Sequence, residues 1–208
     1  MPEPDVLSVF FLAALALGIA PGPDNIFVLT QSALYGRLAG FVVTLGLCTG
    51  LLVHTTAVAF GIAAIFSAST IAFTAIKLLG AAYLLYLAWQ ALKAGTSRFS
   101  ASTETEPSLS QLYRRGIVMN ITNPKVAIFF LAFLPQFADP SAGPLVPQLL
   151  GLGCLFILAT ILVFGLVAWS AGFLGEWLKR SPTAQLVLNR IAALVFVGLA
   201  LRLAVTQR

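Results

Sequence analysis

Residues 21–25 read Pro21-Gly22-Pro23-Asp24-Asn25 and lie inside an apolar stretch long enough to cross a membrane. A second such stretch contains Asn123-Pro124-Lys125. Proline lacks a backbone N–H donor and breaks a helix. In lipid, broken backbone is tolerated only where protein or a water-filled cavity satisfies it. An acid beside one break and a base beside the other therefore indicate a binding site for a small charged solute near the middle of a membrane.

The composition is that of a membrane protein. Of the 208 residues, 59% are hydrophobic and 9% are charged, and the mean hydropathy is +0.97, values outside the range of soluble domains. A bilayer core about 30 Å thick needs roughly 20 apolar residues per helix. The sequence therefore predicts an all-α integral membrane protein with six spans, at residues 6–34, 39–66, 71–92, 112–137, 145–174 and 186–204.

The net charge of +5 indicates orientation in the membrane and is not the footprint of a nucleic-acid-binding protein. Most of the Lys and Arg residues lie in or beside the connections that follow the first, third and fifth spans. The positive-inside rule places these connections in the cytoplasm and both termini outside. Residues 1–5 are acidic, unlike the start of a signal peptide, so we expect the first span to be retained.

The spans divide into two halves. Residues 1–95 hold three spans, residues 96–111 form a Ser/Thr/Glu-rich linker that we expect in the cytoplasm, and residues 112–208 hold three more. Aligning Pro23 with Pro124 places Asp24 opposite Lys125. Because each half has an odd number of spans, the second half is inverted relative to the first, an arrangement that recurs in transporters with a broken helix in each repeat.

The residues around the breaks suit a zwitterion such as an α-amino acid. A helix rise of about 1.5 Å per residue puts both Asp24 and Lys125 near the middle of the membrane. The substrate carboxylate would bind half-helix N–H groups or Lys125, and its ammonium would bind Asp24 and carbonyls freed by the breaks. Asn25 and Asn123 would orient both groups. Alternatively, Asp24 and Lys125 pair permanently and only hold the fold together.

Three other polar residues lie within the spans. His54 either relays protons, because imidazole changes charge near neutral pH, or makes one hydrogen bond to a neighbouring helix. Lys77 either lies on a transport pathway or extends its ammonium toward the membrane surface. Gln31 either lines an inner vestibule or bonds to its own helix.

Small residues and cysteines carry less information. Gly46 and Gly50 form a small-xxx-small pair that brings two helices close, within the monomer or across the seam of a homodimer. Cys48 and Cys154 are far from both breaks and, with a single histidine, form no metal-ligand cluster. No Gly-rich phosphate loop is present, so transport would use an ion gradient or run downhill, with no cofactor.

Three motifs resemble one known family. They are Pro21-Gly22-Pro23-Asp24, the stretch of residues 77–87 (KLLGAAYLLYL) and the stretch of residues 120–137 (NITNPKVAIFFLAFLPQF). The chain is similar nearly end to end to the lysine exporter superfamily, and most similar to its homoserine/threonine-resistance branch of amino-acid efflux proteins. The signature positions of that family fall on Gly22, Pro23 and Asp24 and on Asn123, Pro124 and Lys125.

The resemblance implies a secondary exporter, and not an enzyme, in the bacterial inner membrane. Its substrates would be homoserine, threonine or other neutral amino acids, driven by proton exchange. We hypothesise that Asp24 accepts the substrate ammonium or a proton, so that protonation from outside displaces substrate. Its expected partners are the small-molecule substrate, the lipid bilayer and a second copy in a homodimer. The alternatives are a passive channel for small solutes and a transporter of another substrate such as a metal ion.

Overall fold

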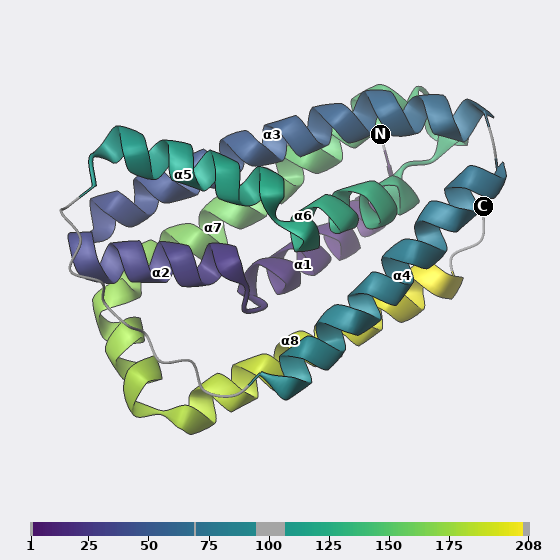
Figure 1. Cartoon of the computed structure of the whole chain (residues 1–208). Helices are drawn as coiled ribbons and strands as arrows, with labels where there is room; N and C mark the ends of the chain where they lie inside the picture. The colour runs from purple at the N-terminus through teal and green to yellow at the C-terminus, as the bar shows by residue number, and fades with distance from the viewer. Residues whose placement is uncertain (1, 69, 95–106, 206–208) are drawn as a thin grey trace.

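The computed structural model describes residues 2–68, 70–94 and 107–205, and within these ranges the chain is helical and contains no strand. Figure 1 shows the elements in order. They are α1 (Pro4–Ile19), α2 (Pro23–Tyr35), α3 (Arg37–Ala68), α4 (Thr70–Lys93), α5 (Leu109–Thr122), α6 (Pro124–Ile128), the π-helix η1 (Phe129–Phe133), the 3-10 helices η2 (Leu134–Phe137) and η3 (Pro140–Ala142), α7 (Leu145–Arg180) and α8 (Pro182–Val205).

The predicted all-α membrane fold is confirmed. Four helices, α3, α4, α7 and α8, are each long and apolar enough to span a membrane. Two bent pairs supply the other spans: α1 and α2 meet at 60°, and α5 meets the segment from Pro124 to Phe137 at 51°. The first and fourth spans are therefore broken at the two proline motifs, as the sequence predicts.

Helix ends extend beyond the apolar stretches. α7 continues to Arg180, past the predicted end at residue 174. α5 begins at Leu109, so the last residues of the predicted linker are helical. The cause is local: Ser108 accepts a hydrogen bond from the Gln111 backbone N–H, and the Gln111 side chain accepts one from the Ser108 N–H, forming a capping box. Residues 96–106 of the predicted linker lie outside the described residues.

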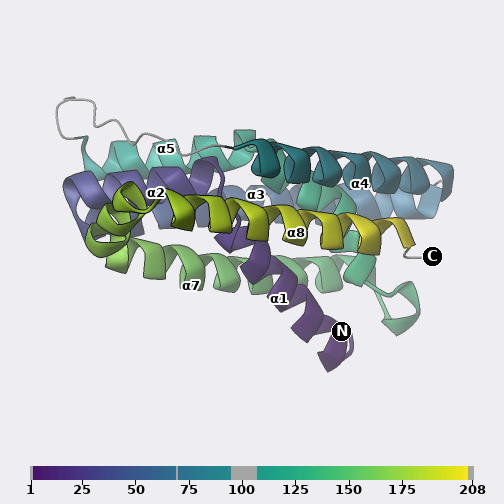
Figure 2. The same ribbon diagram turned by 90° about the horizontal axis from the view of Figure 1, so that it is seen from below.

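Corresponding spans of the two halves lie next to each other. α3 packs along α7 and also along α5, while α4 packs along α8 as a pair that diverges from the other helices (Figures 1 and 2). The two broken spans meet at their breaks. This is the set of neighbours that two repeats would give, and the inverted relation between the repeats stays a prediction.

Glycines allow the closest helix contact. A Cβ on Gly46 would lie 2.2 Å from the Tyr113 carbonyl oxygen, and a Cβ on Gly116 would lie 2.6 Å from the Val43 carbonyl oxygen. A Cβ on Gly50 would lie 2.7 Å from Asn120. Gly46 and Gly50 therefore pack α3 against α5 within the monomer, which is the first of the two uses considered for this pair.

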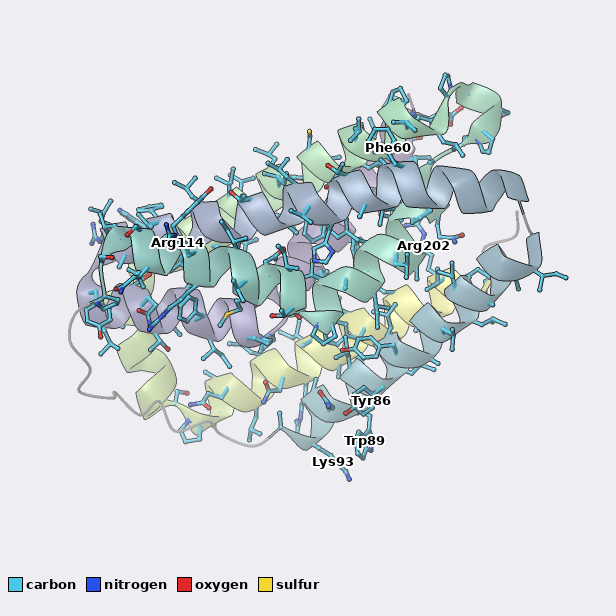
Figure 3. All side chains as sticks on the ribbon, turned by 45° about the horizontal axis from the view of Figure 1, so that its top comes forward. Phe60, Tyr86, Trp89, Lys93, Arg114 and Arg202 are labelled. Carbon is cyan, nitrogen blue, oxygen red and sulfur yellow. The ribbon has the colours of Figure 1, made fainter. Side chains whose placement is uncertain are left out.

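Aromatic residues mark one end of the helices. Tyr86, Trp89 and Lys93 project from the end of α4 in Figure 3, with the Lys93 ammonium 4.1 Å from the Trp89 ring centroid. On the neighbouring helices, the Arg37 guanidinium lies 5.5 Å from the Trp169 ring centroid. Aromatic and basic side chains gather at membrane–water interfaces. Both groups lie at the end of the bundle that the positive-inside rule predicts to be cytoplasmic.

A buried aromatic cluster fills the space beyond the second break. Its rings come from α1, η1, η2 and α7, and neighbouring centroids lie as close as 4.7 Å. Three of the rings, those of Phe129, Phe130 and Phe133, come from the π-helical turn η1. The members are Phe10, Phe129, Phe130, Phe133, Phe137 and Phe156. All six rings are buried, so this region is filled by packed aromatic side chains.

Candidate functional site

The first break leaves backbone carbonyls at the end of α1 without their helical donors. Pro21 has no N–H to bond the Leu17 carbonyl, and α1 ends at Ile19. Side chains take over: the Lys125 ammonium donates to the carbonyl oxygens of Leu17 at 3.3 Å and Ala20 at 3.1 Å. The Asn25 amide donates to the Gly18 carbonyl oxygen at 2.6 Å. The carbonyls of Leu17, Gly18 and Ala20 thus have side-chain donors, which buried backbone requires.

The second break follows the same rule. Pro124 has no N–H for the Asn120 carbonyl, which accepts instead from the Asn123 N–H at 3.1 Å and pairs with His54 Nε2 at 3.2 Å. Because a carbonyl only accepts, His54 Nε2 carries the hydrogen in this contact. Of the two roles considered for His54, the structure shows the hydrogen bond to a neighbouring helix.

Asp24 lies in the first turn of α2 and is 2% exposed. Its Oδ1 accepts from the Asn123 amide at 2.8 Å, and its Oδ2 accepts from the Asn120 amide at 3.2 Å. Both donors belong to the second break. A buried carboxylate is stable only when hydrogen bonds replace lost water, and these amides supply them. The positive end of the α2 dipole adds to the stabilisation.

The two breaks are therefore bound to each other crosswise. The acid of the first break is held by amides of the second, and the base of the second break is held by carbonyls of the first. Asp24 and Lys125 lie in one site but take separate partners. The permanent Asp24–Lys125 pair considered from the sequence is not the arrangement in this structure.

The N-termini of the two half-helices differ. Asn123 Oδ1 accepts from the Lys125 backbone N–H at 3.0 Å and so caps α6. α2 has Gly22 at its N-cap position, without a side-chain cap. A Cβ on Gly22 would lie 2.9 Å from Lys125 Nζ, so the missing side chain leaves room for the ammonium. Of the two helix starts, the α2 start is the one whose N–H groups have no side-chain acceptor.

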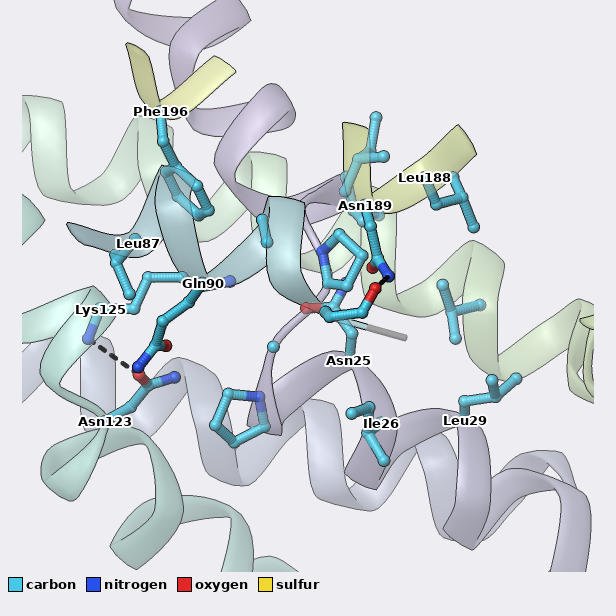
Figure 4. Close-up of a pocket in the computed structure, with 18 of the residues that line it drawn as sticks. Asn25, Ile26, Leu29, Leu87, Gln90, Asn123, Lys125, Leu188, Asn189 and Phe196 are labelled. Atoms are coloured by element: carbon cyan, nitrogen blue, oxygen red, sulfur yellow. Dashed lines mark hydrogen bonds between the residues drawn. The ribbon is translucent and has the colours of Figure 1, made fainter. Parts of the chain in front are cut away.

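A pocket of about 840 Å³ lies beside the breaks, between α1, α2 and α7 on one side and α4 and α8 on the other. Figure 4 shows its polar groups, among them Asn25, Gln90, Asn123, Lys125 and Asn189. The remaining wall is largely apolar and includes Leu15, Ile26, Leu87, Leu162, Leu188 and Phe196. The lining continues to Ala94 and Gln185, near the end of α4 and the start of α8.

The sequence-predicted residues divide into three groups. Gly22, Pro23, Asn25, Asn123, Pro124 and Lys125 line the pocket. Asp24 lies behind the lining and is connected to it through Asn123. His54, Lys77 and Gln31 do not line it. Gln31 is buried on α2, where its Oε1 has no hydrogen-bond partner within the described structure.

Sequence reasoning missed several residues of the site. Asn120 is 2% exposed and holds Asp24, yet it was not among the predicted site residues. Its position four residues before Pro124 is a usable signal, because a polar side chain one turn before a helix break lies close to that break. Gln90, Asn189 and Phe196 come from α4 and α8 and have no comparable signal.

Besides Gln31 Oε1, two buried acceptors have no partner in the described parts of the chain, and both belong to the breaks: Asn25 Oδ1 and Asn120 Oδ1. Asn25 lines the pocket, but this oxygen is itself buried. No group of three or more His, Cys, Asp or Glu side chains that could hold a metal ion gathers in residues 2–68, 70–94 and 107–205. The site thus contains one cationic side chain, Lys125, one carboxylate shielded from the pocket, Asp24, and several side-chain amides.

Comparison with known proteins gives a consistent result. The family model described as LysE type translocator matches residues 15–207. An uncharacterized membrane protein of Vibrio cholerae serotype O1 is 33% identical over 95% of this chain and 96% of its own length. Proteins named leucine efflux protein from Salmonella typhimurium and Salmonella choleraesuis are each 28% identical over 95% of this chain and 94% of their own.

No solved structure matches the chain. The family match spans nearly the whole sequence and includes both proline breaks and the residues bound across them. These six spans are therefore those of a multi-pass membrane transporter, and the chain belongs to the family of LysE type translocators.

Proposed function

We propose that this chain exports neutral amino acids with apolar side chains across the bacterial inner membrane, in exchange for protons. The observation that carries the proposal is the pocket of about 840 Å³ that joins the two breaks to an apolar wall. A zwitterionic head group needs the polar breaks, and an aliphatic side chain needs the wall. The relatives named leucine efflux protein support the same substrate class.

The polar breaks suit the two charges of an amino acid. The uncapped start of α2, with the Asp24 and Asn25 N–H groups and the positive helix dipole, would receive the carboxylate. The carbonyl oxygens of Leu17 and Ala20 would receive the ammonium. All of these groups lie within a few residues of one another in the first break, which fits the short distance between the charges of the substrate.

Asp24 would be the proton site. It is shielded from the pocket but bound to Asn123, which lines the pocket and also caps α6. Protonation of Asp24 would replace a charge-assisted hydrogen bond from Asn123 with a weaker one. Because Asn123 both caps α6 and lines the pocket, the position of the α6 N-terminus and the shape of the pocket would then change together. This change would couple proton binding to substrate release.

Alternating access would follow from the arrangement of the helices. α4 and α8 pair with each other and form one side of the pocket, while α1, α2 and α7 form the other. Relative motion of these two parts would open the pocket to either face. With the termini outside, the Ala94 and Gln185 end of the pocket faces the cytoplasm, where an exporter takes up its substrate.

The test is amino-acid efflux from bacterial cells preloaded by dipeptide feeding, with leucine, threonine, homoserine and lysine compared. We expect saturable export of leucine that a proton gradient drives and that isoleucine and valine compete for. Preferential export of threonine or homoserine would replace the apolar substrate class with a polar one. Flux that does not saturate would indicate a passive channel. Export of none of the four would contradict the proposed function.

A further inference from the structure

We propose that the Lys125 ammonium is a tethered substitute for the substrate ammonium. In this inference, which rests on the function proposed above, Lys125 occupies the ammonium site whenever the pocket is empty. The substrate displaces it on binding, and Lys125 returns when the substrate leaves. Lys125 would thereby allow the empty carrier to close and reset.

The site itself is a cation site made of neutral carbonyls. The oxygens of Leu17 and Ala20 lie 3.3 and 3.1 Å from Lys125 Nζ, and both carbonyls lie at the proline break between α1 and α2. They are hydrogen-bond acceptors, so their binding partner must be a donor. A lysine ammonium and an α-ammonium carry the same –NH₃⁺ group with three donors. The same two oxygens can therefore accept either ammonium.

Lys125 is held in a way that permits exchange. Both acceptors, the Leu17 and Ala20 carbonyl oxygens, are uncharged. These two bonds use two of the three N–H donors of the ammonium, and the third makes neither of them. The carboxylate of the site, Asp24, is bound to Asn120 and Asn123 instead. Lys125 also lines the pocket, so the substrate and the lysine side chain share one cavity.

Gly22 keeps the path of the ammonium open. Its backbone is extended, with φ −172°, a conformation that any residue adopts. A Cβ there would lie 2.9 Å from Lys125 Nζ, so an alanine would crowd the flexible end of the lysine without straining the backbone. Gly22→Ala therefore displaces the Lys125 ammonium but keeps the positive charge in the site.

The energetic argument concerns the closed empty state. While the pocket is open, water can bond the carbonyls of Leu17 and Ala20. When the pocket closes, carbonyls without a donor in a nonpolar surrounding are unfavourable. Lys125 supplies the donor in the empty carrier, and the substrate ammonium supplies it in the loaded carrier. Loss of Lys125 would thus slow only the reset of the empty carrier.

The experiment separates net efflux from exchange. Purified protein is reconstituted in liposomes loaded with radiolabelled leucine, and efflux is measured with and without unlabelled leucine outside. Net efflux requires return of the empty carrier, whereas exchange does not. For Lys125→Ala we expect net efflux to fall by about tenfold or more, as loss of a charged hydrogen bond predicts, with exchange within about twofold of the wild type. Gly22→Ala should lower net efflux more than exchange, by a smaller factor than Lys125→Ala does.

Lys93→Ala is the matched control, because it removes a lysine that stacks on the exposed Trp89 outside the pocket. Equal loss of both rates in Lys125→Ala would overturn the inference, provided that its melting temperature and gel-filtration profile match the wild type. If that variant does not fold, equal effects on both rates in Gly22→Ala overturn it. Unchanged net efflux in either variant also overturns it. A wild-type protein that moves no leucine would contradict the proposed function, and this inference with it.

Discussion

The Asn123 amide nitrogen lies 2.8 Å from Asp24 Oδ1, so the carboxylate of the first helix break is bound by the second break. The same Asn123 caps α6 through its oxygen and lines the pocket. One side chain thus joins the buried acid, the start of a half-helix and the cavity. A change at Asp24 can therefore reach the pocket through this residue.

The first prediction concerns the stability of this connection. Asn123→Ala removes the α6 cap and a hydrogen bond to a buried carboxylate, and we expect it to destabilise the protein by about 2 to 4 kcal/mol. Asn123→Ser retains a capping oxygen and should lose less. Thermal unfolding in detergent measures both. Unchanged stability of Asn123→Ala would contradict the role of Asn123 in binding the breaks together.

The second prediction concerns proton coupling. In Asp24→Asn the side chain keeps its size but cannot change charge, so export should no longer respond to a pH gradient across the membrane. The measurement is the rate of net leucine efflux from liposomes at several internal and external pH values. His54→Gln serves as the comparison, because His54 hydrogen-bonds the Asn120 backbone carbonyl and does not line the pocket. Coupling that persists in Asp24→Asn would place the proton site elsewhere.

The third prediction concerns helix packing. A Cβ on Gly46 would lie 2.2 Å from the Tyr113 carbonyl oxygen, so Gly46→Ala must separate α3 from α5 and should lower the melting temperature. Gly61→Ala in the same helix meets nothing within 4 Å and should leave stability unchanged or slightly raised, because alanine favours helix by about 1 kcal/mol. Equal effects of the two substitutions would contradict the packing described.

The fourth prediction concerns the orientation of the pocket. In a background with Cys48 and Cys154 replaced by alanine, Ala94→Cys places a single thiol at the mouth between α4 and α8. A membrane-impermeant thiol reagent should label it from the cytoplasmic side, and excess leucine should slow the labelling. Labelling from the outer side alone would reverse the assigned topology.

The fifth prediction concerns side-chain selectivity. Ala91 lines the pocket on α4, so Ala91→Leu fills part of the space that we assign to the substrate side chain. Export of leucine should fall by about tenfold relative to export of alanine, the discrimination expected of a few methylene groups. Ala91→Ser, which adds one atom, is the control. If the ratio of leucine to alanine export does not change, the side chain binds elsewhere.

Much of the fold could be predicted because local chemistry determines it. Pro21, Pro23 and Pro124 lack backbone donors, and α1, α2, α5 and α6 end or begin at these positions. Hydropathy located all six spans, since each needs a long apolar run. Helix ends were less accurate: α5 starts in the predicted linker because a Ser–Gln capping box, not hydropathy, determines where it begins.

The partners of the site residues could not be predicted in the same way. The sequence indicated that Asp24 and Lys125 share a site, but each finds its partners on the opposite break, and that depends on tertiary packing. The bond from Lys125 to the Ala20 carbonyl joins residues far apart in the chain. The pocket walls on α4 and α8 depend equally on tertiary packing, because an apolar helix shows no amphipathic face to indicate its side.

The most direct test of the central claim is net leucine efflux from preloaded cells, with wild type, Asp24→Asn and Lys125→Ala compared at matched membrane expression. Lys93→Ala is the control for loss of a lysine outside the pocket. We predict saturable efflux for the wild type and for Lys93→Ala, and loss of net efflux in both break variants. Efflux that persists in Asp24→Asn and Lys125→Ala would assign these residues a structural role and contradict a transport site at the two breaks.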